Sequence, residues 1–207
     1  MASALRRPLS QNNIMAVDEV LKRLRDETGV SIMQCKKALA EAGGDLEKAK
    51  VILRKQSSAI ASKKADRTLG AGVAVAYTHA GNSVVGAVVL GCETDFVSKN
   101  GEFSKLAYDI AMHVAAMGPK FISRDDVKEE DLRAAREVFQ EEAAKVPEAA
   151  RAKAIEGKVD SYLRERVLLE QPFVKDANFT IRQLLDSAVQ KFGEKVEVVR
   201  FERLSVR

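Results

Sequence analysis

The chain has 207 residues, 46% hydrophobic and 31% charged, with a formal net charge of +4. This composition is typical of a folded protein with a sizeable core and excludes a collagen-like or low-complexity chain. No apolar run approaches the roughly 20 residues that cross a bilayer and no signal-peptide core lies near the start, so we expect a cytoplasmic protein without a membrane span.

The N-terminal third is basic. Residues 1–70 carry 14 Lys and Arg against 8 Asp and Glu, and the rest of the chain carries 20 against 22. This imbalance is compatible with an acidic partner, with nucleic acid, or with a solvated helical surface. Residues 1–14 contain no acidic residue and no apolar periodicity. We expect them to form a disordered leader, with Met15 near the start of the folded chain.

Residues 15–54 are predicted to form a domain of three short helices. Apolar residues recur with a helical period in each segment. Ser31 and Gln34 have the spacing of a capping box at the start of the second helix, and Asp45 can cap the third. Residues 55–70 lose the apolar stripe and gain Ser, Lys and Gly, which predicts a linker.

Residues 71–207 are predicted to form an α+β core. Two Val-rich segments, 71–78 and 83–92, flank the turn sequence HAGN and predict an antiparallel β-hairpin. Apolar residues then recur with a helical period over 103–117, before Gly-Pro. We expect this helix to cover one face of the hairpin.

The next segments, 125–144 and 148–169, are charged amphipathic helices with thin apolar stripes. Stripes this narrow favour a protruding antiparallel helical hairpin, at about 125–169, over a buried helix pair. Pro147 lies where the first turn of a helix tolerates proline.

The C-terminal part is predicted to complete the sheet. "QPFV" (171–174) breaks the helical pattern, 180–192 resumes it, and 196–206 alternates like a strand. A phase slip at Val198-Val199 indicates a bulge. We expect this strand to join the hairpin, in a small antiparallel sheet whose unpaired edges invite pairing with another chain.

Patterns that could carry chemistry are weak. Gly81 and Gly86 have the spacing of a phosphate loop, but Ala and Val follow where Lys and Ser or Thr would hold phosphate and magnesium. Cys35 and Cys92 have neither metal-site spacing nor a C-x-x-C arrangement, so we expect two reduced, packed thiols.

Two further classes of function are left open by the residues. Glu93, Asp95 and His113 could serve a hydrolase, although paired carboxylates are common in surface turns and a lone histidine beside an apolar stripe is usually structural. A nucleic-acid-binding module could use the basic N-terminal helical domain and the linker, but an aromatic content of 5% offers no evident stacking platform. The basic residues of the linker include Lys63, Lys64 and Arg67.

The segment "CETDFVSKN" (92–100) places Phe96 between Asp95 and Val97 at a strand-to-helix junction. Burial preferences would favour a polar turn there. Either Phe96 packs into its own core, or it is offered to another protein.

Three segments resemble one family. They are "LRDETGVSIMQCKKALAEAGGDLEKA", "CETDFVSKN", and "AMHVAA" with "QPFV". Their order is similar to that of elongation factor Ts, the nucleotide exchange factor of elongation factor Tu, from Val17 to Val206. The resemblance implies a ubiquitin-associated-like three-helix domain, a linker, and an α+β core with an inserted helical coiled-coil hairpin. It also implies a short form with one core unit, completed by homodimerisation through the sheet.

The resemblance further implies which residues meet the partner. In the family, Asp and Phe of the Thr-Asp-Phe-Val motif press against the nucleotide-binding domain, and the aromatic ring wedges in near the magnesium and phosphate site. It implies a non-catalytic protein with elongation factor Tu as partner, no cofactor or metal, and no direct contact with membrane or nucleic acid. The residues carried over are Thr94, Asp95, Phe96, Val97, His113, Lys36 and Val174.

Overall fold

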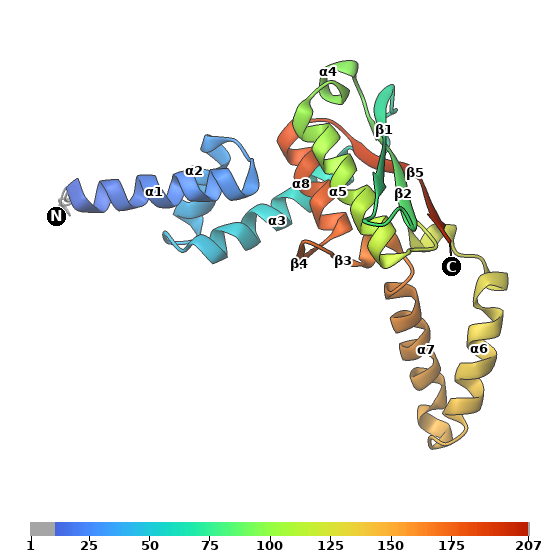
Figure 1. Ribbon diagram of the computed structural model, residues 1–207. Helices are drawn as coiled ribbons and strands as arrows, with labels where there is room; N and C mark the ends of the chain where they lie inside the picture. The colour runs from blue at the N-terminus through green and yellow to red at the C-terminus, as the bar shows by residue number, and fades with distance from the viewer. Residues whose placement is uncertain (1–10, 207) are drawn as a thin grey trace, which may run out of the picture. The chain divides into compact units, whose positions relative to one another are not determined.

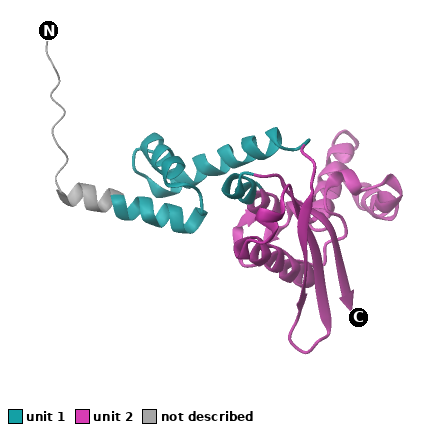
Figure 2. Ribbon diagram, turned by 90° about the horizontal axis from the view of Figure 1, so that it is seen from above, with its two compact units in different colours: residues 1–66, 186–193 teal, residues 67–185, 194–207 magenta. Residues whose placement is uncertain are grey.

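The computed structural model describes residues 11–206, with side chains from residue 18 onward. The structure is α+β, as predicted (Figure 1). It divides into two units (Figure 2). Unit 1 holds the residues up to Asp66 together with Asp186–Gly193, and unit 2 holds Arg67–Leu185 with the residues from Glu194. Within the described residues, no helix combines the length and apolar character of a membrane span.

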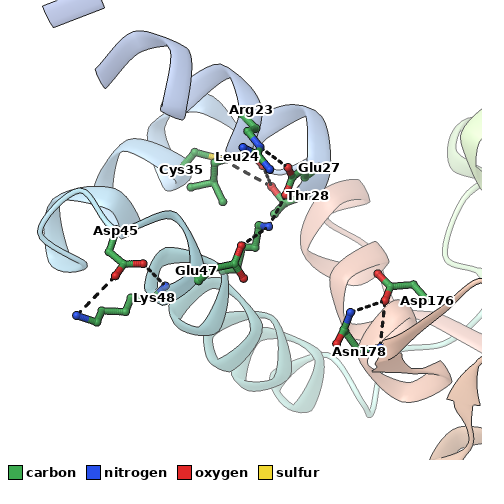
Figure 3. Close-up of polar contacts among 11 residues, drawn as sticks. Arg23, Leu24, Glu27, Thr28, Cys35, Asp45, Glu47, Lys48, Asp176 and Asn178 are labelled. Atoms are coloured by element: carbon green, nitrogen blue, oxygen red, sulfur yellow. Dashed lines mark hydrogen bonds and ion pairs between the residues drawn. The ribbon is translucent and has the colours of Figure 1, made fainter. Parts of the chain in front are cut away.

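Unit 1 contains the helices α1 (Gln11–Thr28), α2 (Ile32–Glu41) and α3 (Leu46–Lys63). Both predicted caps form. The Ser31 hydroxyl accepts from the Gln34 amide at 3.4 Å. The Asp45 carboxylate accepts from the Lys48 amide at 3.0 Å (Figure 3). The likeness to a ubiquitin-associated domain stays a prediction. The helices enclose an apolar core of Leu24, Val30, Cys35, Ala38, Leu39, Ala49 and Leu53.

Two boundaries of unit 1 differ from the prediction. Helix α1 begins at Gln11, so the end of the expected leader is helical, and residues 1–10 lie outside the described residues. Helix α3 runs to Lys63, through most of the expected linker. Ser57 and Ser62 are accommodated in this continuation, since each hydroxyl donates to the carbonyl four residues earlier, at 2.9 and 3.0 Å, and does not compete for the backbone as a cap would.

Unit 2 is built on an antiparallel sheet in the order β1-β2-β5 among the described residues. The strands are β1 (Ala71–Thr78), β2 (Val84–Cys92) and β5 (Val196–Ser205), which confirms the predicted hairpin and the returning strand. Val89 pairs with Arg200 and Leu90 with Val198, so one extra residue lies between them on β5. The predicted bulge is therefore present.

Helix α5 (Gly101–Met117) covers one face of the sheet, as expected (Figure 1). The close approach depends on Gly86 of β2, because a Cβ atom there would overlap the carbonyl oxygen of Ala111 and lie 2.7 Å from the nitrogen of Ala115. Asn100 caps the start of α5, accepting from the Glu102 amide at 2.9 Å, and Gly118 ends it in the left-handed region with φ +57°.

Helices α6 (Glu129–Ala143) and α7 (Glu148–Arg164) form the predicted hairpin, which projects from the sheet (Figure 1). Both helices are shorter than predicted, because turns of 3₁₀ helix flank the pair. Arg124 fixes the base of the hairpin, with its guanidinium 2.6 Å from Asp160 and 2.5 Å from Glu170.

A second, two-stranded sheet was not predicted. It consists of β3 (Pro172–Phe173) and β4 (Asp176–Thr180), and it leads directly into α8 (Ile181–Phe192). Helix α8 is divided between the units. In unit 1, the side-chain amide of Gln190 lies in hydrogen-bond contact with the Ser57 hydroxyl, and the carbonyl of Gly193 accepts from Lys64 at 2.6 Å.

Candidate functional site

The Thr-Asp-Phe-Val motif forms a one-turn helix, α4 (Asp95–Ser98), directly after β2. Thr94 precedes it with an extended backbone, at φ −127° and ψ 159°. Successive helical residues point about 100° apart, so neighbouring side chains on one turn face different surroundings. Phe96 is 83% exposed, whereas Val97 is 4% exposed. The structure thus holds the valine inward and presents the aromatic ring outward.

Asp95 lies beside Phe96 on the surface. Its carboxylate is 2.6 Å from the ammonium group of Lys99, one turn further along the chain, and both side chains are largely exposed. An exposed pair of this kind contributes at most about 1 kcal/mol. Lys99 can therefore give way to another donor, which leaves Asp95 available for an intermolecular contact.

Thr94 is turned toward its own molecule. Its hydroxyl donates to the carboxylate of Glu194 at 2.5 Å. Glu194 was not among the predicted site residues, and the two are 100 positions apart, so no local pattern joins them. Thr94 consequently supports the motif instead of offering its hydroxyl to a partner.

His113 is fully buried on α5 and connects three elements. Its Nε2 lies 2.9 Å from Oε1 of Gln171, and its Nδ1 accepts from the amide of Val174 at 3.2 Å. This pattern assigns the neutral ring with the proton on Nε2. Burial lowers the pKa of His113, and the hydrogen bond with Gln171 opposes that effect only in part.

The burial of His113 and Val97 revises the expectation that their side chains touch a partner. As the chain is folded, neither side chain is available for direct contact. Val174, whose amide the histidine holds, is 44% exposed. The histidine therefore acts on the surface through Val174, and Val97 acts by anchoring α4.

Lys36 belongs to unit 1, on α2, and is exposed. Two exposed apolar side chains precede it by three and four positions, which places all three on one surface of the helix. They are Met33, 73% exposed, and Ile32, 48% exposed. Neither residue was singled out as exposed from the sequence alone.

The structure assigns different partners to the groups that a hydrolase would combine. The Glu93 carboxylate accepts from Arg67 at 3.2 Å and from the Lys195 amide at 2.6 Å. Asp95 pairs with Lys99, and His113 is buried in its own hydrogen bonds. These groups do not form a joint acid–base site.

Other chemistry is also unsupported. Gly86 packs against α5, so the glycine pair of the hairpin does not form a phosphate loop. Cys35 and Cys92 are free and buried, as predicted. In the described range, no group of three or more His, Cys, Asp or Glu side chains could hold a metal ion.

The fold and the site define a class of protein. It is an α+β protein that presents an exposed aromatic side chain and an exposed carboxylate at a strand-to-helix junction. An exposed apolar side chain held in this way is typical of a surface that contacts another molecule.

Comparison with known proteins identifies the family. A family model described as elongation factor TS matches residues 17–207. Elongation factor Ts of Desulforamulus reducens is 44% identical, over 89% of this chain and 86% of the relative. Elongation factor Ts of Koribacter versatilis is 43% identical, over 90% and 86%, and that of Thermosipho melanesiensis is 42% identical, over 91% and 97%. The chain belongs to the elongation factor Ts family.

Proposed function

We propose that this protein is a guanine nucleotide exchange factor that promotes GDP release from elongation factor Tu during translation elongation in the cytoplasm. It performs no chemical reaction of its own in this role. Family membership supports the choice of partner. The observation that carries the proposal is Phe96, a large apolar side chain left 83% exposed by a fold that buries its neighbour Val97.

In the proposed mechanism, Phe96 inserts near the magnesium and phosphate site of the partner and displaces groups that hold them. Asp95 exchanges its exposed bond with Lys99 for a donor on the partner. Val97 and Thr94 keep the turn in place, one by packing and one through Glu194. The inserted ring and the intact magnesium and phosphate site cannot be present together. Binding of the factor therefore weakens the binding of GDP.

Phe96 alone does not supply enough free energy. Burying one phenylalanine contributes about 1.5–3 kcal/mol, whereas weakening nucleotide binding about 1,000-fold requires about 4 kcal/mol. A wider interface must provide the rest. Lys36 in unit 1 and Val174, held by His113, are the further contacts we propose. Coupling is reciprocal, so rebinding of nucleotide weakens the grip of the factor and releases it.

The test is Phe96→Ala. Losing the burial of this ring should slow factor-stimulated GDP release by about 10- to 100-fold. Because the ring is exposed in the free protein, the free energy of unfolding should change by no more than about 0.5 kcal/mol. GDP release from elongation factor Tu is followed with a fluorescent nucleotide, and unfolding with denaturant.

Val138→Ala is the matched control, since Val138 is 51% exposed on α6, away from the motif. It should leave both measurements unchanged. GDP release that does not respond to the wild-type protein would refute the proposed function. A Phe96→Ala variant that unfolds would show that the ring serves its own core.

We also propose that the protein forms a homodimer through the open face of its sheet. On β1 and β2 the face opposite α5 carries small or apolar side chains, and β1 alternates so that every second residue is exposed. On β5 the same face also carries the exposed ion pair of Arg200 with Glu202, whose charges can pair across a two-fold interface. A sheet face of this kind gains stability by packing against a second sheet. The exposed residues of this face include Ala74, Ala76, Val89, Val199 and Leu204.

A further inference from the structure

The turn between α8 and β5 reaches the base of the motif. Gly193 ends α8 with φ +73°, and Glu194 follows. The Glu194 carboxylate accepts three hydrogen bonds from two consecutive residues, 3.1 Å from the Glu93 amide, 3.0 Å from the Thr94 amide and 2.5 Å from the Thr94 hydroxyl. One side chain therefore satisfies every donor that Thr94 possesses.

The connection is reciprocal. The Glu93 carboxylate, after β2, accepts from the Lys195 amide, before β5, at 2.6 Å. Glu93 therefore binds the backbone before β5, and Glu194 binds the backbone after β2. We call these four residues, Glu93, Thr94, Glu194 and Lys195, the carboxylate clasp. Hydrogen bonds to ionised acceptors are roughly twice as strong as neutral ones. The clasp therefore adds charge-assisted hydrogen bonds to the backbone pairing of Cys92 with Val196, where β2 ends and β5 begins.

The motif needs such an attachment. A helix of one turn is not stable by itself, because nucleating a turn fixes several dihedral angles for a single hydrogen bond. Thr94 makes no side-chain capping bond to α4. Glu194 sets the position of Thr94 instead, and Thr94 lies two residues before Phe96. Val97, one residue after Phe96, is buried. Phe96 is thus presented between a polar anchor and an apolar anchor.

We propose that Glu194 is a positioning residue for nucleotide exchange, which fixes the orientation of α4 so that Phe96 and Asp95 enter the partner together. This inference rests on the proposed function. A carboxylate suits the role because it has only acceptors, and here it accepts three donors at once. A glutamine would turn amide hydrogens toward donors and keep only part of the set.

The experiment compares Glu194→Ala and Glu194→Gln with the wild-type protein. The maximal rate of GDP release at saturating factor should fall about 10-fold for Glu194→Ala, because a misplaced group loses rate even when binding persists. The concentration giving half the maximal rate should change less, within about 3-fold, since the other contacts remain. The maximal rate for Glu194→Gln should lie between those of the wild-type protein and Glu194→Ala, because glutamine keeps part of the hydrogen-bond set.

A second readout requires no partner. Amide hydrogen exchange of Glu93 and Thr94 should accelerate at least about 10-fold in Glu194→Ala, while the amides of α5 keep their protection. Asp126→Ala is the matched control, because Asp126 accepts from the amide and hydroxyl of Ser123 at 2.7 and 3.1 Å in the same manner. It should leave GDP release within about 2-fold of wild type.

The outcomes separate the inference from the proposed function. Suppose that Glu194→Ala and Glu194→Gln stimulate GDP release from elongation factor Tu at the wild-type rate, while Phe96→Ala does not. The positioning role is then wrong and the exchange function stands. The positioning role is equally wrong if the rate falls with unchanged amide exchange at Glu93 and Thr94. If Phe96→Ala also stimulates GDP release at the wild-type rate, the proposed mechanism itself fails. Should Glu194→Ala unfold, Glu194→Gln decides by the same two readouts.

Discussion

Phe96 and Val97 are neighbours on one turn of helix, but one side chain faces solvent and the other packs into the core. One ring is 83% exposed and the adjacent side chain is 4% exposed. The energetic roles differ accordingly, because an exposed side chain contributes little to folding whereas a buried valine contributes about 1.5–3 kcal/mol. Substitutions at the two positions should therefore affect different measurements, binding for the first and stability for the second.

His113 should make the protein less stable in acid. Its pKa is lowered by burial, so the unfolded chain binds more protons than the folded chain as the pH falls through the unfolded value of about 6.5. The stabilisation is complete above that pH and is lost toward the lower folded pKa. Protonation of Nδ1 would also direct a hydrogen at the Val174 amide. Denaturant unfolding between about pH 7.5 and pH 5 measures the effect.

His113→Gln provides the comparison for this prediction. The variant should be less stable throughout, by about 1–3 kcal/mol for disrupted buried hydrogen bonds, but its stability should depend less on pH over this interval. The two proteins differ only at position 113, so every other titratable group is common to both. Parallel pH profiles for the two proteins would show that His113 is not the responsible group.

At the residue scale, local sequence patterns point to individual residues but not to the distant residues that hold them in place. The exposed strand-to-helix junction pointed to Phe96, and the border position of His113 pointed to a structural histidine. Its partner Gln171 is 58 positions away, and Glu194 is 100 positions from Thr94. Such pairs leave no periodic or capping signal, because they depend on how distant elements meet.

At the scale of elements, the contact of α5 with β2 depends on the absence of a side chain. Gly86→Ala should destabilise unit 2 by about 3 kcal/mol, since the added methyl group meets backbone atoms that cannot move independently. The measurement is the free energy of unfolding by denaturant, with circular dichroism confirming that the fold is retained.

Gly157→Ala is the opposite case. Gly157 lies inside α7 with no heavy atom within 4 Å of an added Cβ. Alanine should stabilise this helix by about 0.5–1 kcal/mol, because glycine loses more backbone freedom on folding. Equal effects from the two substitutions would contradict the close approach at Gly86.

The elements with strong periodicity or clear turn chemistry were predictable. The hairpin boundaries, the bulge on β5 and the paired helices α6 and α7 all follow from local patterns. The missed elements have weaker local signals. β3 has two residues, too few for an alternation, and α3 continues through serines whose hydroxyls bond back to the helix.

At the scale of the whole molecule, the open sheet face yields a test of the proposed dimer. Ala76→Lys places a charge on this face, opposite Ala87 of β2. Burying that charge between two sheets is costly, so the variant should be monomeric at concentrations where the wild-type protein has twice the chain mass of 22.7 kDa. Light scattering coupled to size exclusion gives both masses.

The control is the same change on another surface. Ala134→Lys lies at an exposed position of α6 and should leave the mass unchanged. Ala76 is exposed in the single chain, so neither variant should lose more than about 0.5 kcal/mol of monomer stability. A wild-type protein that has the mass of one chain at every concentration would remove the dimer from the proposal.

The division into units could be predicted only in part. The change in composition after residue 70 marked a boundary close to Asp66. The assignment of Asp186–Gly193 to unit 1 was not visible, because it depends on hydrogen bonds such as that between Ser57 and Gln190. A helical segment that packs in the earlier unit has the same apolar periodicity as one that packs in the later unit. The periodicity therefore does not show to which unit the segment belongs.

The exposure of Phe96 has a consequence for living cells. Because the ring contributes so little to its own fold, a chain that lacks it escapes the chaperones and proteases that remove unfolded proteins. On the proposed function, such a chain accumulates normally and still engages elongation factor Tu through its remaining contacts. It therefore competes with intact copies, and a mutation at this one position acts as a dominant inhibitor instead of a simple loss.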